Sequence, residues 1–256
     1  MSSRAAAEDF PGAITRERLL TICAWGVHLY TGLGAALGLL AIYYAAIHDY
    51  RASFLAMGVA TIIDSSDGPL ARLLQVKTRV PSFDGALLDN IVDYLTYTVA
   101  PVFLMLEANI IPGTRVGLLL ACFVMLASVY GFCQTNAKTD DHYFLGFPNY
   151  WNLVAFYLYC LDLGTAFNVA VLLILGVMVF VPLRYIYPNR TVPLRPLTLT
   201  LGIVWAVVTV AMLLMLPTIN SLMLALSLSF IVYYFLASFA LHARALHARA
   251  ALRVAR

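Results

Sequence analysis

Charged residues are scarce in this sequence. Only 11% of its 256 residues are Asp, Glu, Lys or Arg, and 62% are hydrophobic, whereas soluble domains contain about 25% charged residues. This shortage of charge excludes a disordered chain, a nucleic-acid-binding protein with a basic surface and an ordinary soluble enzyme. At roughly 20 residues per span, the chain has room for on the order of eight membrane helices with short loops. The sequence therefore predicts an all-α, polytopic membrane protein.

Paired cysteines and a cleavable signal are also lacking. The four cysteines lie singly in apolar segments, without a Cys-x-x-Cys pair, which argues against structural metal ligation and a disulfide framework. The N-terminal segment has acidic and polar residues where a signal peptide needs an apolar core, so we expect no cleavage. We expect one membrane domain over 1–256. Within it, 11–20 form an amphipathic surface helix or the frayed start of the first span, and 242–256 form a basic cytoplasmic tail.

Eight apolar segments, separated by polar residues, Pro or Gly, predict the membrane spans; the fifth is short, which leaves a count of seven open. They cover approximately residues 22–46, 51–73, 83–108, 114–135, 148–162, 165–187, 197–216 and 219–241. With eight spans, both termini share one side with the even-numbered loops, and that side holds 14 of the 16 Lys and Arg residues; only Arg51 and Arg115 lie opposite. Because positive residues mark the cytoplasmic side, we expect both termini in the cytoplasm.

Acidic residues concentrate where the second span ends and the third begins. Five of the 13 fall between positions 64 and 93, and acids within spans are costly and mark functional sites. With about 3.6 residues per turn, one set shares a face of the second span, with Arg72 at its margin: Asp64, Asp67, Gly68 and Ala71. A second set shares a face of the third span: Gly85, Asp89 and Asp93.

Two antiparallel helices joined by a hairpin can point these four carboxylates at one another. Four close anions repel, and a divalent cation would remove that penalty; oxygen ligands suit Mg²⁺ or Mn²⁺. The small residues Gly68, Ala71 and Gly85 leave backbone exposed, either for close approach of a flat ligand or for helix packing. Arg72 suits either an anionic phosphate or a helix end at the membrane surface.

These residues form the pattern D-x-x-D-G-x-x-A-R, then twelve residues, then G-x-x-x-D-x-x-x-D. The pattern resembles the signature of the CDP-alcohol phosphotransferase family, membrane enzymes of phospholipid synthesis. The interval between Arg72 and Gly85 is longer than is usual in the family. Together with the segment 138–159, it makes the chain look most like the bacterial phosphatidylcholine synthases.

The resemblance implies a six-helix catalytic core, a homodimer, and a metal site facing the cytoplasm at the bacterial inner membrane. Carried over by position, the metal ligands for two Mn²⁺ or Mg²⁺ ions are Asp64, Asp67 and Asp89. Asp93 is implied as the general base, with a metal contact of its own. The resemblance also implies that three small residues make room for the cytidine nucleotide, namely Gly68, Ala71 and Gly85. It implies that Arg72 contacts phosphate.

The implied reaction joins choline to CDP-diacylglycerol and gives phosphatidylcholine and CMP, with Asp93 taking the proton of the choline hydroxyl. A quaternary ammonium is commonly bound by aromatic faces and a carboxylate. The candidates for such a site, each of which an interfacial aromatic belt would also explain, are Tyr94, Tyr97, Phe144, Phe147, Tyr150, Trp151 and Tyr157, with Asp140 or Asp141.

Two alternatives stand beside this interpretation. The first keeps the mechanism and changes the acceptor to serine, inositol phosphate or glycerol phosphate, although anionic acceptors would need extra cations where the fifth span supplies aromatic residues. The second is a cation transporter that uses the carboxylates. A transporter predicts acids near the bilayer midplane and repeated halves, whereas these acids gather at one surface and the sequence shows no internal repeat.

Overall fold

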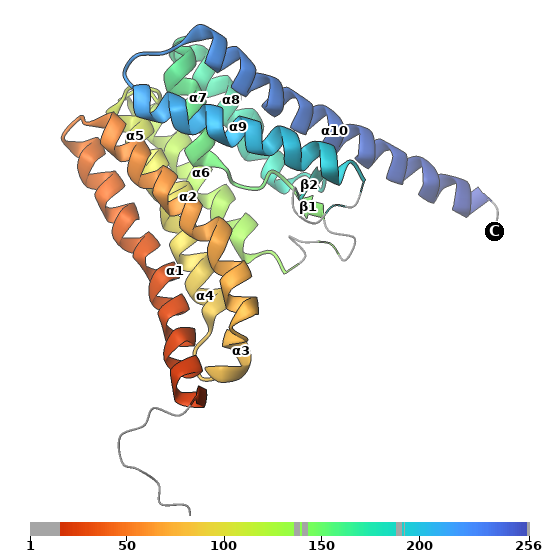
Figure 1. Cartoon of the computed structure of the whole chain (residues 1–256). Coiled ribbons are helices and arrows are strands. Elements are labelled where there is room, and N and C mark those ends of the chain that lie inside the picture. Colours follow the sequence, from red (N-terminus) through yellow and green to blue (C-terminus); the bar gives the residue numbers. More distant parts are fainter. Residues whose placement is uncertain (1–15, 136–138, 140–142, 188–190, 192, 255–256) are drawn as a thin grey trace, which may run out of the picture.

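The structure is a computed structural model that describes residues 16–135, 139, 143–187, 191 and 193–254. Within these ranges the chain is almost entirely helical, as the sequence predicts (Figure 1). The helices that correspond to the first four predicted spans are α1 (Arg16–Ala46), α2 (Tyr50–Leu73), the continuous run of α4 (Gly85–Asp93), η1 (Tyr94–Val99) and α5 (Ala100–Glu107), and α6 (Arg115–Cys133). The remaining spans correspond to α7 (Trp151–Leu161), α8 (Thr165–Phe180), α9 (Arg195–Met215) and α10 (Ser221–Val254).

Several of these helices can cross a membrane. Among the described residues, α1, α6, α9 and the Ser221–Leu246 part of α10 are long and apolar enough to span a bilayer, and α7 and α8 are shorter apolar helices. Large apolar side chains point away from the protein on their outer faces; for example, Leu29 is 70% exposed and Leu222 is 79% exposed. Such faces are suited to lipid, and the chain is a multi-pass membrane protein.

Two glycines of α1 set the distance between α1 and the helix that carries Asp89 and Asp93. A Cβ atom on Gly34 would lie 2.5 Å from Cγ1 of Val92, and one on Gly38 would lie 2.7 Å from Cγ of Leu95. The pattern Gly-x-x-x-Gly therefore lets α4 and η1 pack directly on the α1 backbone, as small residues do between membrane helices.

The long interval between Arg72 and Gly85 contains α3 (Val76–Arg79), a single helical turn. Val76 and Val80 are buried against α1, and Arg79 forms an ion pair with Glu17 at 2.8 Å. The additional residues therefore dock the hairpin onto the beginning of α1, below α2 and α4 in Figure 1. Of the proposed surface helix, residues 16–20 form the first turns of α1, and 11–15 lie outside the described residues.

The expected sixth span, 165–187, is too long. Helix α8 ends at Phe180, just before Pro182, and proline cannot continue a helix ladder. The chain then forms β2 (Arg184–Ile186), which pairs antiparallel with β1 (Tyr143–Leu145). Three hydrogen bonds hold β2 on α10: Ser238 Oγ accepts from the Ile186 amide at 3.0 Å, the Tyr234 hydroxyl donates to the Ile186 carbonyl at 3.1 Å, and His242 Nδ1 accepts from the Arg184 amide at 3.3 Å. This ribbon joins the loop before α7 to the loop before α9.

Candidate active site

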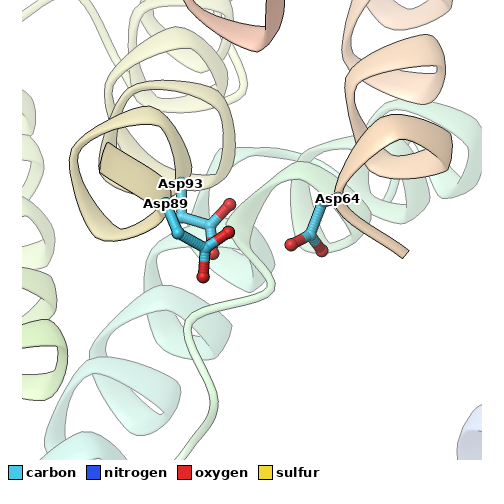
Figure 2. Close-up of side chains that lie close together, drawn as sticks. All are labelled: Asp64, Asp89 and Asp93. Carbon is cyan, nitrogen blue, oxygen red and sulfur yellow. The ribbon is translucent and has the colours of Figure 1, made fainter. Parts of the chain in front are cut away.

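Three carboxylates from two helices converge. Asp64 comes from α2, and Asp89 and Asp93 lie one turn apart on α4. One oxygen of each carboxylate lies within 4.8 Å of the others, and all three side chains are half-buried. Figure 2 shows Asp89 and Asp93 pointing toward Asp64 across the gap between the helices. The described residues thus offer three oxygen ligands that can hold a metal ion.

The helix after Asp93 reaches back to this cluster. Residues 94–99 form a π-helical segment in which the Ala100 amide donates to the Leu95 carbonyl, and Pro101, which has no N–H, follows directly. Such segments are frequent at functional sites. From it the buried Tyr97 donates its hydroxyl to Oδ2 of Asp64 at 2.7 Å.

Asp67 lies one turn along α2 from Asp64, outside the group of three. It is 6% exposed, and its Oδ2 accepts a hydrogen bond from the Thr31 hydroxyl of α1 at 2.7 Å. The structure therefore brings three of the four predicted carboxylates into one cluster and ties the fourth to α1 beside it.

Two cavities meet at these carboxylates. The first, about 650 Å³, lies between α2, α4 with η1, and the chain before α7; the second, about 870 Å³, lies between α1, the end of α2 and residues 75–86. Their common wall consists of Asp67, Gly68, Arg72 and Asp89. Asp64 and Asp93 line the first cavity but not the second.

The small residues and Arg72 lie along the wall between the cavities. A Cβ placed on Gly68 would have Nη1 of Arg72 as its nearest neighbour, at 3.4 Å, which is an ordinary contact. The absence of a side chain at Gly68 therefore leaves space at the common wall. Ala71 lines the second cavity. A Cβ on Gly85 would lie 2.8 Å from Cε1 of His28, so Gly85 makes room for an imidazole of α1. Helix α2 continues past Pro69, and Arg72 is part of its last turn.

The predicted aromatic candidates separate into two groups. Four of them line the first cavity: Tyr97, Phe144, Phe147 and Tyr150. The other three described candidates do not line either cavity: Trp151 is fully buried and donates to Ser128 Oγ at 2.7 Å, Tyr94 packs edge-on against Phe132, and Tyr157 hydrogen-bonds Trp205. Asp140 and Asp141 lie outside the described residues.

The cavity-lining residues that were absent from the sequence-based candidates include one further aromatic ring and one imidazole. Tyr187 lines the first cavity and stacks on Phe144, with 4.5 Å between ring centroids; the pairing of β1 with β2 brings the two rings together. His28 lines the second cavity from α1. The aromatic and β-branched residues Tyr-Ile-Tyr at 185–187 were a short strand signal in the sequence, whereas nothing local distinguished His28.

Comparison with known proteins identifies relatives of this fold. Residues 27–182 match the family model described as CDP-alcohol phosphatidyltransferase. The chain is 37% identical over 223 residues to a phosphatidylcholine synthase of Legionella pneumophila subsp. pneumophila, covering 84% of this chain and 87% of that protein. It is 35% identical over 209 residues to the phosphatidylcholine synthase of Mesorhizobium japonicum (80% and 78% covered). It is 37% identical over 184 residues to that of Pseudomonas aeruginosa (72% and 77% covered). The matched family segment contains both carboxylate-bearing helices.

Proposed function

The chain belongs to the CDP-alcohol phosphatidyltransferase family, and we propose that it transfers the phosphatidyl group of CDP-diacylglycerol to choline. The products are phosphatidylcholine and CMP. The family and the enzyme class predicted from the sequence are confirmed. The observation that carries the proposed reaction is that the carboxylate cluster lies where two cavities of different character meet.

The two cavities divide the substrates between them. The second cavity contains the three small motif residues Gly68, Ala71 and Gly85 and takes the cytidine nucleotide. The first contains the aromatic residues together with Asp93 and takes choline. The diphosphate lies along the common wall, where Arg72 offers a forked cationic donor. In this division the acceptor hydroxyl approaches the diphosphate from the first cavity, where the common wall faces both cavities.

The carboxylate set fits a hard divalent cation. Three oxygens from three side chains within 4.8 Å of one another match the all-oxygen ligation that Mg²⁺ and Mn²⁺ prefer. We assign the ligands as Asp64, Asp67, Asp89 and Asp93, for two ions. When bound, such ions neutralise the charge of the diphosphate and of the departing CMP.

Asp93 is assigned as the general base. A choline hydroxyl is a weak acid, so its proton must leave as its oxygen attacks. Asp93 accepts this proton while the choline oxygen bonds to the phosphorus that carries the diacylglycerol. The bond from that phosphorus to the bridging oxygen breaks, and CMP leaves with the bonding electrons. Asp93 suits this role because it lines the cavity assigned to choline and not the nucleotide cavity.

Aromatic faces in the first cavity bind the trimethylammonium group. This group has no N–H to donate, so the ring faces and nearby carboxylates supply the attraction. The rings placed for it are Tyr97, Phe144, Tyr150 and Tyr187. They surround the same cavity as Asp93, so they hold choline beside the proposed general base.

The orientation and the assembly are also part of the proposal. We propose a homodimer in the bacterial inner membrane, with both termini and the site on the cytoplasmic side. Fourteen of 16 Lys and Arg residues support this sidedness. Nucleotide and choline then enter from the cytoplasm, and the acyl chains leave sideways between helices into the bilayer.

Acceptor selectivity tests the proposed reaction. The purified protein is supplied with CDP-diacylglycerol and Mn²⁺ or Mg²⁺, and the lipid products formed with choline, serine, inositol phosphate or glycerol phosphate are identified by mass spectrometry. We expect phosphatidylcholine and CMP with choline alone. A product with serine and not choline would overturn the acceptor, and no CMP release with any alcohol would overturn the reaction.

A further inference from the structure

His28 is a buried polar residue at the second cavity that the proposed mechanism does not use. Its side chain is 8% exposed. Its Nε2 atom is buried and has no hydrogen-bond partner among the described residues. Buried polar atoms are almost always hydrogen-bonded, so an unpartnered atom in a residue that lines a cavity needs an explanation, and a ligand that enters the cavity can supply the partner.

The imidazole ring is held in one place. Phe83 packs against it with 4.5 Å between ring centroids, and Trp25 lies edge-on at 5.7 Å. On another side Gly85 has no side chain, and any Cβ there would collide with the ring at 2.8 Å. Contacts from α1, the loop after α3 and the start of α4 therefore fix the ring, as a recognition residue requires.

The position of His28 relates it to the nucleotide and not to the acceptor. It lines the second cavity, which shares Asp67 and Asp89 with the first, and it does not line the aromatic cavity. One turn further along α1, Thr31 donates to Asp67. The same face of α1 thus contacts the carboxylate wall through Thr31 and the interior of the nucleotide cavity through His28.

We propose that His28 is a specificity-determining residue that recognises the pyrimidine base of the nucleotide, with Nε2 accepting a hydrogen bond from the exocyclic amine of cytosine. This inference rests on the proposed function. A neutral imidazole has one acceptor nitrogen and one donor nitrogen. In the tautomer that carries its proton on Nδ1, Nε2 is the acceptor; uracil has a carbonyl oxygen where cytosine has the amine, so two acceptors would then face each other. A site built around a buried polar group rejects a ligand that leaves this group unpaired.

The test compares CMP with UMP as ligands. Binding of each to the full-length protein in detergent with Mn²⁺ is measured by isothermal titration calorimetry, for the wild type and for His28→Phe, which keeps a ring between Phe83 and Gly85. We expect the wild type to prefer CMP. In His28→Phe the Kd of CMP should rise about tenfold and the Kd of UMP should stay the same or fall, because the unpaired acceptor is gone, while the KM of choline stays at the wild-type value. His28→Gln, which can place an amide oxygen near the Nε2 position, should recover part of the preference.

His48→Phe is the matched control, because His48 lies in the turn between α1 and α2 and bonds Tyr50; it should leave both affinities unchanged.

A wild type that does not bind CMP would overturn the proposed function, and one that binds CMP and UMP equally would overturn the role of His28. A His28→Phe protein that keeps the full preference for CMP would overturn the role of His28 alone. If His28→Phe does not purify as a folded protein, His28→Ala and His28→Gln are compared instead. A preference for CMP that is the same in both variants contradicts the inference. A preference that is lost in His28→Ala and partly recovered in His28→Gln supports it.

Discussion

The Tyr97 hydroxyl donates to Asp64 at 2.7 Å and so connects the π-helical segment after Asp93 to the carboxylate of the neighbouring helix. A hydrogen bond to a proposed ligand orients that ligand, and loss of such a bond typically lowers metal affinity. The donor and Asp93 belong to one continuous helix, so the same segment positions carboxylates from both sides of the cluster.

Tyr97→Phe should weaken metal binding and keep the fold. Without the hydroxyl, Asp64 loses a fixed orientation, and the Mn²⁺ concentration for half-maximal CMP release should rise by about tenfold or more. The measurement is a metal titration of the reaction. Tyr94→Phe is the control, because Tyr94 lies on the same helix and packs against Phe132 but does not itself line the cavity. An unchanged titration in Tyr97→Phe would show that this bond does not support the metal.

Asp93→Asn should remove turnover while leaving nucleotide binding. The amide cannot accept the proton of choline, and general bases contribute about 10²–10⁴-fold to rate. We expect a fall in kcat of this size, with the Kd of CMP within a few-fold of the wild type. Asp84→Asn serves as the control: Asp84 caps α4 by accepting from the Ala86 and Leu87 amides, and Asn caps helices equally well. Near-normal turnover in Asp93→Asn would exclude Asp93 as the base.

Tyr187→Leu should raise the KM of choline without changing nucleotide affinity. A desolvated cation–π contact is worth about 0.5–2 kcal/mol, so KM should increase about threefold to thirtyfold. Steady-state kinetics with varied choline at saturating CDP-diacylglycerol give this value. The matched variant Tyr130→Leu changes a tyrosine that packs on Phe180 and does not line the cavity. Equal choline KM values in both variants would contradict an aromatic choline site.

Gly34→Ala should destabilise the protein and reduce activity, because the new Cβ meets Cγ1 of Val92 at 2.5 Å. Val92 is buried and β-branched, so its side chain cannot easily turn away. The cost should be about 1–3 kcal/mol, seen as a lower Tm in detergent. At Gly32 nothing lies within 4 Å of an added Cβ. Gly32→Ala should therefore leave Tm unchanged or slightly raised, and a similar loss in both variants would contradict direct packing of α4 on α1.

Local patterns predicted the spans and the acidic cluster. Apolar runs determine where helices cross a membrane, so the eight segments were found with two clear boundary errors. Pro182 ends α8 early, and α10 continues to Val254, past the expected end at residue 241. The spacing of Asp89 and Asp93 places both on one face of any helix. Their meeting with Asp64 follows from the hairpin of α2 and α4.

Features that depend on distant parts of the chain could not be predicted in this way. Tyr187 reaches the cavity because β2 pairs with β1. The paired residues Leu145 and Arg184 are 39 positions apart in the sequence. The docking of α3 depends on the contact of Val76 with α1. His28 differs from other residues of α1 because its buried Nε2 has no hydrogen-bond partner among the described residues. Each of these depends on contacts between elements, which hydrophobic periodicity does not encode.

The most direct test of the two-cavity account is an anomalous difference map of the protein crystallised with Mn²⁺ and CDP-diacylglycerol. We predict manganese peaks among Asp64, Asp67, Asp89 and Asp93, with the cytosine ring in the cavity lined by His28 and the aromatic cavity left for choline. Manganese bound elsewhere, or the cytosine ring between Phe144 and Tyr187, would contradict it.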